Sequence, residues 1–274
     1  MEVREMNHST KKALWLGIQR QTYIFITIVI TSCLHFGCAS SDEGVQVAAS
    51  AGPPEVIAEA ERLFENRRDL SNLREAVKLL GKARRENQRS YEVEWKFARA
   101  NYFLGRHSED EKESTKALED GKKAAKIAAA MEPDRPDGHF WFGANLGEQS
   151  NRNPLAIGIV SVGEIQEAMN KVIAIDPGYQ NASAYGALGK IELATRLMGG
   201  DLAKAVEYLE KAVELDKNNG DVRLYLAEAF LAQNKDAEAR KHLEYVVKIK
   251  PHPQYVLEHQ QQMTRAKKLL ETEF

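Results

Sequence analysis

The first residue that could do chemistry is Ser161, which lies in the glycine-flanked segment 158–163. A serine between glycines resembles the nucleophile elbow of hydrolases, where a sharp strand-to-helix turn exposes the hydroxyl group. Here the spacing of the glycines differs by one residue from that motif, and no strand pattern precedes the serine. We therefore interpret segment 158–163 as a loop of small residues between helices.

A second candidate is the glycine-rich segment 186–190, which ends in a lysine and resembles a phosphate-binding loop. Ala184 and Ile191 stand at positions where that motif requires Gly and Ser or Thr. We interpret the glycines instead as places where two helices approach each other closely.

Three histidines near the C-terminus, His242, His252 and His259, lie close enough in sequence to suggest a metal site. Two prolines around His252 separate them, and no carboxylate completes an evident ligand set. Glutamates and lysines at spacings of three and four residues look like solvated helix faces. We therefore expect neither a metal site nor a cofactor, and we predict that the chain is not an enzyme.

The composition supports a globular protein without a nucleic-acid partner. The chain has 274 residues, of which 43% are hydrophobic and 28% charged, and its formal net charge is -2. Such a balance provides no basic surface for nucleic acid. The two cysteines, Cys33 and Cys38, both lie near the N-terminus. The remaining residues can therefore form neither a disulfide framework nor a cysteine-based zinc site.

The N-terminal region has the pattern of a secretory signal. A basic start precedes the apolar run Tyr23–Ile30, which is followed by small residues. Ile30–Cys33 resembles the bacterial lipobox, in which the lipidated cysteine follows an aliphatic residue and two small ones. Cys38 is an alternative lipid site, although His35 stands where an aliphatic residue is expected. We favour Cys33.

These observations define three predicted segments: a lipoprotein signal and lipobox region at 1–38, a flexible tether at 39–54, and a helical domain at 55–274. A membrane span would need about 20 apolar residues, and this run is shorter. A disulfide between the two cysteines would require that the segment be kept. The start of translation, at Met1 or Met6, stays open.

The elements that must position any site are helices. The pattern predicts five helix pairs: 55–66 with 70–86, 90–105 with 108–133, 137–147 with 162–175, 181–197 with 201–215, and 221–233 with 236–250. A further helix at 255–270 is expected to cover the exposed end of the stack. Ser90 is expected to cap its helix, and Ser108 to start a capping box. The segment 151–161 is inserted inside the third pair.

The last two pairs repeat each other with a shift of 34 residues: Ala205, Leu209 and Ala212 superpose on Ala239, Leu243 and Val246. A period of this length is typical of tetratricopeptide arrays, whose helix pairs stack into a superhelix. We therefore predict an all-α, tetratricopeptide-like superhelix of about five irregular pairs with a C-terminal capping helix. Function is expected where the chain departs from the period, around 137–165 and 185–200.

The chain resembles the TatT-type component of TRAP transporters, a family of bacterial tetratricopeptide lipoproteins. The resemblance rests on the lipobox and on the order of six segments: 62–69, 94–99, 141–147, 175–179, 199–201 and 266–270. The resemblance covers about residues 30–272. It implies a periplasmic scaffold, lipid-anchored to the outer membrane, that partners the solute-binding component of a TRAP system. It also implies a small apolar or organic-acid ligand.

The predicted contact residues come from the repeat positions and from an aromatic segment. Five residues are expected to line the concave face: Lys96, Phe103, Phe140, Lys190 and Leu224. The aromatic segment 139–142 with Asn145 is denser than one helix face requires, so we add Trp141 and Asn145 as anchors for a ligand or partner. Burial of these rings between repeats is the alternative. A homo-oligomer is possible, and an envelope-assembly lipoprotein of the pilotin kind is the alternative function.

Overall fold

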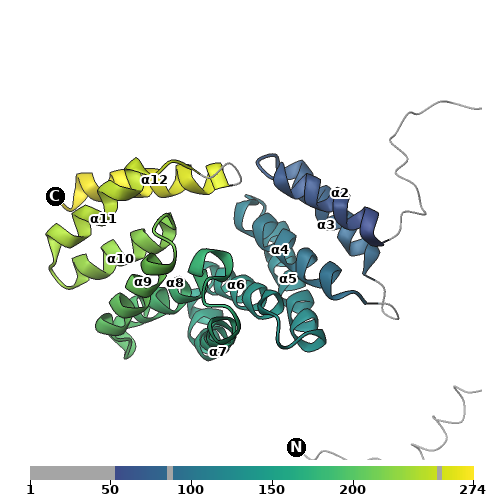
Figure 1. Ribbon diagram of the computed structural model, residues 1–274, viewed down its shortest axis with the longest axis horizontal. Coiled ribbons are helices and arrows are strands. Elements are labelled where there is room, and N and C mark those ends of the chain that lie inside the picture. Colours follow the sequence, from purple (N-terminus) through teal and green to yellow (C-terminus); the bar gives the residue numbers. More distant parts are fainter. Residues whose placement is uncertain (1–52, 85–88, 252–254) are drawn as a thin grey trace, which may run out of the picture. The chain divides into compact units, whose positions relative to one another are not determined.

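The computed structural model describes residues 53–84, 89–251 and 255–274, and the signal region, both cysteines, most of the tether and His252 lie outside them. The chain divides into two units, 1–47 and 48–274, and the described residues all belong to the second. In this part of the chain every regular element is a helix (Figure 1). None of these helices has the length and apolar character needed to cross a lipid bilayer.

The helices follow one another as antiparallel pairs, as the sequence predicts. Their bounds are α2 (Pro53–Glu65), α3 (Leu70–Ala83), α4 (Tyr91–His107), α5 (Glu111–Met131), α6 (Pro136–Arg152), α7 (Ile159–Ile175), α8 (Tyr179–Ala194), α9 (Leu202–Leu215), α10 (Gly220–Ala232), α11 (Asp236–Lys248) and α12 (Val256–Thr272). Each helix packs against the next one, and α4 also packs against α6 and α8 against α10. The fold is therefore a stack of helix pairs.

Small and aliphatic residues hold the stack together. The two sets of residues related by the 34-residue shift are completely buried: Ala205, Leu209 and Ala212 on α9, and Ala239, Leu243 and Val246 on α11. Alanines at these positions let the helices approach, while the leucines fill the space between pairs. The 34-residue repeat of the sequence therefore corresponds to a repeat of buried contacts between helices.

The glycines of the segment 186–190 serve this packing. A Cβ atom on Gly189 would lie 2.5 Å from Cγ of Leu209, and one on Gly186 would lie 2.8 Å from Cγ2 of Val222. Both glycines lie within α8, which presses against α9 and α10. Close helix contact, rather than phosphate binding, explains these glycines.

Ser108 does not form the predicted capping box. The N-cap residue of α5 is Asp110, whose side chain accepts hydrogen bonds from the backbone N–H groups of Lys112 and Glu113. The Ser108 hydroxyl instead donates to Glu113 Oε2 at 2.6 Å. Asp110 took the capping position because it directly precedes the helix, where its carboxylate reaches the free N–H groups of the first turn.

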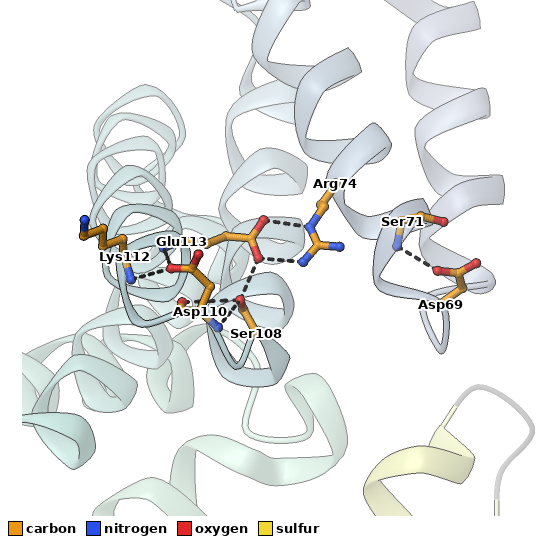
Figure 2. Close-up of polar contacts among 7 residues, drawn as sticks. All are labelled: Asp69, Ser71, Arg74, Ser108, Asp110, Lys112 and Glu113. Carbon is orange, nitrogen blue, oxygen red and sulfur yellow. Dashed lines mark hydrogen bonds and ion pairs between the residues drawn. The ribbon is translucent and has the colours of Figure 1, made fainter.

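Glu113 also joins the first pair to the second. Arg74 on α3 donates from Nε and Nη2 to the two carboxylate oxygens, at 2.7 Å and 2.8 Å (Figure 2). The hydrogen bonds from Arg74 and Ser108 lower the pKa of Glu113 to about 2. The carboxylate therefore stays charged far into the acid range.

This pKa predicts a pH-dependent contribution to stability. Because the pKa in the folded protein is below its ordinary value, the stabilisation is complete above the ordinary range and is lost as the pH falls toward about 2. Glu113→Gln should therefore lower the free energy of unfolding by about 1 kcal/mol at pH 7, and by much less at pH 2. Urea unfolding followed by circular dichroism at both pH values checks this. An equal loss of unfolding free energy at both pH values would contradict it. The same loss in the control variant Glu109→Gln would also contradict it.

Candidate functional site

The described helices line a cavity of about 810 Å³ that is partly open to solvent. Its walls come from α4, α6, α7, α8, α10 and α12 and from the turns that follow α8, α9 and α11. Small-molecule sites in proteins generally have volumes of about 300–1,000 Å³. The cavity is thus of a size for a small ligand or a short chain segment.

One wall of the cavity is aromatic. Phe103 on α4 and Phe140 and Trp141 on α6 line it, together with Tyr102. The ring centroids of Phe140 and Trp141 are 5.0 Å apart in an edge-to-face arrangement, and those of Tyr102 and Phe103 are 5.2 Å apart. Aliphatic residues of α7, Ile165 and Met169 among them, extend this surface. The wall offers apolar contact to a ligand.

Three cations line the same cavity, Arg106, Lys190 and Lys250, and the first two are close enough to interact electrostatically. Arg106, in the last turn of α4, donates from Nη1 to the hydroxyl oxygen of Tyr102 at 3.0 Å. Lys190 on α8 donates from Nζ to Oδ1 of Asn151 at 3.1 Å and lies 5.3 Å from the ring centroid of Tyr225. Within the described residues, neither Arg106 nor Lys190 has a carboxylate oxygen within 4.0 Å of its side-chain nitrogen atoms.

The electrostatics of Lys190 show that its charge is not fully compensated. Burial lowers the pKa of Lys190, and the positive charge of Arg106 acts in the same direction. Glu148 and Asp221 oppose this shift, but the net pKa stays below its ordinary value. Glu148 is itself bound to Arg152, with 3.3 Å between Oε1 and Nε. An anion placed between Arg106 and Lys190 would stabilise both charges.

A left-handed turn brings polar side chains to the cavity. The sequence predicts a helix from Asn181, but Gln180, Asn181 and Ala182 have φ angles of 49°, 60° and 57°. Such angles are costly for residues with a Cβ atom and persist only where the surroundings hold them. Here Asn219 donates from Nδ2 to the carbonyl oxygen of Asn181 at 2.9 Å. The turn places Gln180 and Asn181 among the lining residues.

Four of the seven predicted contact residues line the cavity: Phe103, Phe140, Trp141 and Lys190. Phe103, Phe140 and Trp141 also belong to the hydrophobic core, and the exposed fractions of 7%, 7% and 2% agree with the alternative that these rings are buried between repeats. The other three predicted residues have packing partners elsewhere. Lys96 forms ion pairs with Glu61 and Glu92, and Leu224 belongs to the core of the C-terminal pairs. The binding role of all seven residues stays a prediction.

Asn145 ties two pairs together from a completely buried position on α6. Its Nδ2 donates to the carbonyl oxygens of Trp141, at 2.7 Å, and of Ala98 on α4, at 3.2 Å. The side chain also fills the space above Gly121 of α5, where a Cβ atom would lie 2.3 Å from Oδ1. These contacts give Asn145 a structural role between α4, α5 and α6.

The remaining candidates for chemistry lie in ordinary helical surroundings. Ser161 is 5% exposed and lies in the first turn of α7 rather than in an elbow. The inserted segment before it forms a π-helical turn, Pro154–Gly158, instead of a loop. No cluster of three or more His, Cys, Asp or Glu side chains suited to a metal ion occurs among the residues that the structure describes.

Several lining residues were not anticipated from the sequence. Arg106 and Tyr225 belong to first helices of pairs, where the repeat pattern constrains mainly small and bulky apolar positions. Glu258 and His259 line the cavity from α12, which was expected only to cover the end of the stack. A cation one turn after the aromatic residues of α4 is the one sequence signal that could have indicated Arg106.

Comparison with known proteins defines the class of this fold. Residues 196–258 match the tetratricopeptide repeat model. The solved structure of a thermophilic tetratricopeptide protein, TTC0263 of Thermus thermophilus, is similar with a TM-score of 0.57 and 19% identity, over 78% of this chain and 100% of that one. Pseudomonas aeruginosa pilF is similar with a TM-score of 0.53 and 16% identity, over 81% and 93%. The protein is a tetratricopeptide-like helical-repeat scaffold, a fold suited to protein–protein interaction.

A second model identifies the family. Residues 56–192, half of the chain, match the family described as regulator of microtubule dynamics protein 1-3, and the chain belongs to this family. No curated protein matches the sequence. Proteins with tetratricopeptide repeats are generally scaffolds rather than enzymes.

Proposed function

We propose that this protein is a lipid-anchored scaffold on the periplasmic side of a bacterial envelope. It binds a small carboxylate with an apolar body in its cavity, and it partners the solute-binding component of a TRAP-type uptake system. The observation that carries the ligand proposal is the pair Arg106 and Lys190, which line a cavity with an aromatic wall and have no carboxylate oxygen at ion-pair distance among the described residues.

The charges and the walls of the cavity select the class of ligand. Arg106 and Lys190 are half-buried. A partly desolvated cation gains from a charged partner, so a carboxylate between the two is stabilised by both. The apolar body then contacts the rings of Phe140 and Trp141 and the side chain of Met169. Four carboxylates line the same cavity, and they disfavour ligands with several negative charges: Glu148, Asp216, Asp221 and Glu258. A monocarboxylate fits this arrangement best.

The partner proposal rests on the sequence. The lipobox and the ordered segments from 62–69 to 266–270 resemble the TatT-type component, and the helical-repeat fold suits a protein partner. Leu34 follows Cys33, and Ala39 follows Cys38. Because neither of these residues is Asp, the usual sorting rule for lipoproteins favours the outer membrane as the location. We expect the concave face of the helical-repeat domain to engage the partner, while the cavity of about 810 Å³ holds only a small ligand.

A titration with a fluorescent carboxylate tests the ligand proposal. The full chain in detergent is expected to bind cis-parinaric acid, a carboxylate with a long apolar chain, more tightly than its uncharged methyl ester by at least about tenfold. Equal affinity for the acid and the ester would show that the two cations do not contribute, and it would overturn the proposal.

Capture of the partner is a separate experiment. The immobilised full chain is expected to bind the purified solute-binding component of a TRAP system from the same genome, measured by biolayer interferometry. A related solute-binding protein of another transporter class is the control. Binding of both or of neither would contradict the TRAP assignment, and capture of an envelope-assembly protein instead would favour the pilotin-like alternative.

A role on microtubules, which the description of the family names, is the second candidate function. The observation that favours it is the family match over residues 56–192. Co-sedimentation of the full chain with assembled microtubules would support this role. A chain that stays in the supernatant while it binds the carboxylate probe would leave the first proposal standing.

A further inference from the structure

The C-terminal helix returns to the beginning of the stack. Glu258, in the first turn of α12, accepts hydrogen bonds at 3.4 Å from Nε and Nη2 of Arg67, which lies in the turn between α2 and α3. Oε1 of Glu258 is also 3.8 Å from Nε2 of His107, at the end of α4. Figure 1 shows the start of α12 beside the α2–α3 turn and the end of α4. The last helix therefore contacts both of the first two pairs.

This contact is buried and charged. The side chains of Arg67, Glu258 and His107 are exposed by only 5%, 8% and 7%. Although burial alone raises the pKa of Glu258, His107 and Arg67 outweigh it and hold the pKa below its ordinary value. The Arg67 guanidinium also lies 5.2 Å from the ring centroid of Tyr255. We call Arg67, His107, Tyr255 and Glu258 the latch.

The other half of α12 is attached elsewhere. Ala266 is completely buried in the core of the C-terminal pairs, and Leu269 packs against that core. Arg265 forms an ion pair with Glu228 of α10. The helix thus has one apolar anchorage near its C-terminal end and a separate polar contact at its first turn.

The first turns of α12 are also a wall of the cavity. Tyr255, Glu258, His259 and Gln262 line it on this side. A ligand in the cavity would have these side chains on one side and those of α4, α6 and α8 on other sides. Movement of the first turn would change access to the cavity, while the anchorage near Ala266 would keep the helix on the stack.

We propose that α12 is a gate: release of Glu258 from Arg67 and His107 lets the first turn of α12 move away and widens the opening of the cavity for ligand exchange. A buried ion pair suits this role, because its attraction is largely offset by the cost of desolvation, so the closed and open states differ little in free energy. An apolar contact of equal size would hold the helix more firmly. The gate deepens the proposed function, but its opening can be measured without a ligand.

Hydrogen exchange of the full chain tests the opening. Glu258→Gln removes the charge and keeps the shape of the side chain. It is expected to raise the exchange rate of the amides at 259–262, the first that bond within the helix, by about tenfold or more, because one partner of a buried ion pair is lost. Glu228→Gln is the matched control, since it removes the other ion pair of α12, and it should leave exchange at 259–262 unchanged. Equal exchange in wild type and Glu258→Gln would overturn the latch.

Access to the cavity is measured by thiol labelling. Ala144 lines the cavity from α6, and Ala144→Cys introduces a thiol with little change in volume. Labelling at residue 144 by a maleimide is read by peptide mass spectrometry, so that Cys33 and Cys38 do not contribute. In the Glu258→Gln background the labelling rate is expected to rise about as much as the exchange rate. Faster exchange with unchanged labelling would show that α12 moves but does not gate the cavity.

Ligand release separates this inference from the proposed function. If cis-parinaric acid binds, its dissociation rate is expected to rise in Glu258→Gln and to stay unchanged in Glu228→Gln. If the acid does not bind while labelling of the thiol introduced by Ala144→Cys still accelerates, the gate stands and the carboxylate proposal fails. An unchanged dissociation rate in Glu258→Gln would overturn the gate.

Discussion

Glu94→Gln is expected to destabilise the fold more than any surface substitution, by about 3 kcal/mol. Glu94 on α4 is completely buried. Its two carboxylate oxygens accept hydrogen bonds from Arg84 Nε at 2.9 Å and from Arg89 Nη1 at 2.8 Å. Because Arg84 ends α3 and Arg89 precedes α4, this one carboxylate holds the end of α3 to the start of α4.

Urea and thermal unfolding of the full chain measure the loss. Glu75→Gln is the control, because Glu75 forms an exposed ion pair with Lys78 within one helix, and its loss should cost about 0.5 kcal/mol or less. Unfolding of the first two pairs before the rest would also agree with the structure, since repeat stacks need not unfold in one step. A Glu94→Gln protein as stable as Glu75→Gln would contradict the structural role of this carboxylate.

The largest functional effect is expected at two of the cavity cations. Arg106→Met and Lys190→Met should each weaken binding of cis-parinaric acid by about tenfold or more, since each removes a charged hydrogen-bond donor to the carboxylate. Binding of the methyl ester should change little, because methionine keeps the apolar part of the side chain. Fluorescence titration of both compounds gives the ratio of affinities for each variant.

The ratio of the affinities for acid and ester shows whether a substitution has removed an anion contact or has changed the shape of the cavity. Lys211→Met, at an exposed lysine of α9 paired with Glu214, controls for a general change in net charge and should leave both affinities unchanged. If acid and ester lose affinity equally in Arg106→Met or Lys190→Met, the substitution has altered the cavity walls rather than removed an anion contact. Thermal unfolding of each variant verifies that the fold persists.

The helix pairs could be predicted because they are local in sequence. The 3.6-residue period and the recurring alanines define α9 and α11, and the structure starts and ends these helices within about two residues of the predicted bounds. The π-helical turn at Pro154–Gly158 was not predicted, because an inserted segment carries no period to read. The left-handed residues 180–182 were missed for a different reason, since nothing in their residue types requires such a turn.

The cavity could be predicted only in part. Phe103, Phe140, Trp141 and Lys190 were found from repeat positions and aromatic density. The contribution of α12 depends on a contact between residues 67 and 258, which are 191 positions apart. No local pattern links Arg67 to Glu258, so this side of the cavity could not be derived from the sequence.

The most direct test of the central claim is a crystal structure of the protein with 11-bromoundecanoic acid, whose bromine is located by anomalous scattering. The account predicts bromine against the aromatic wall at Phe140 and Trp141, and a carboxylate about 3 Å from the nitrogen atoms of Arg106 and Lys190. Bromine outside the cavity, or a carboxylate that points away from both cations, would contradict it.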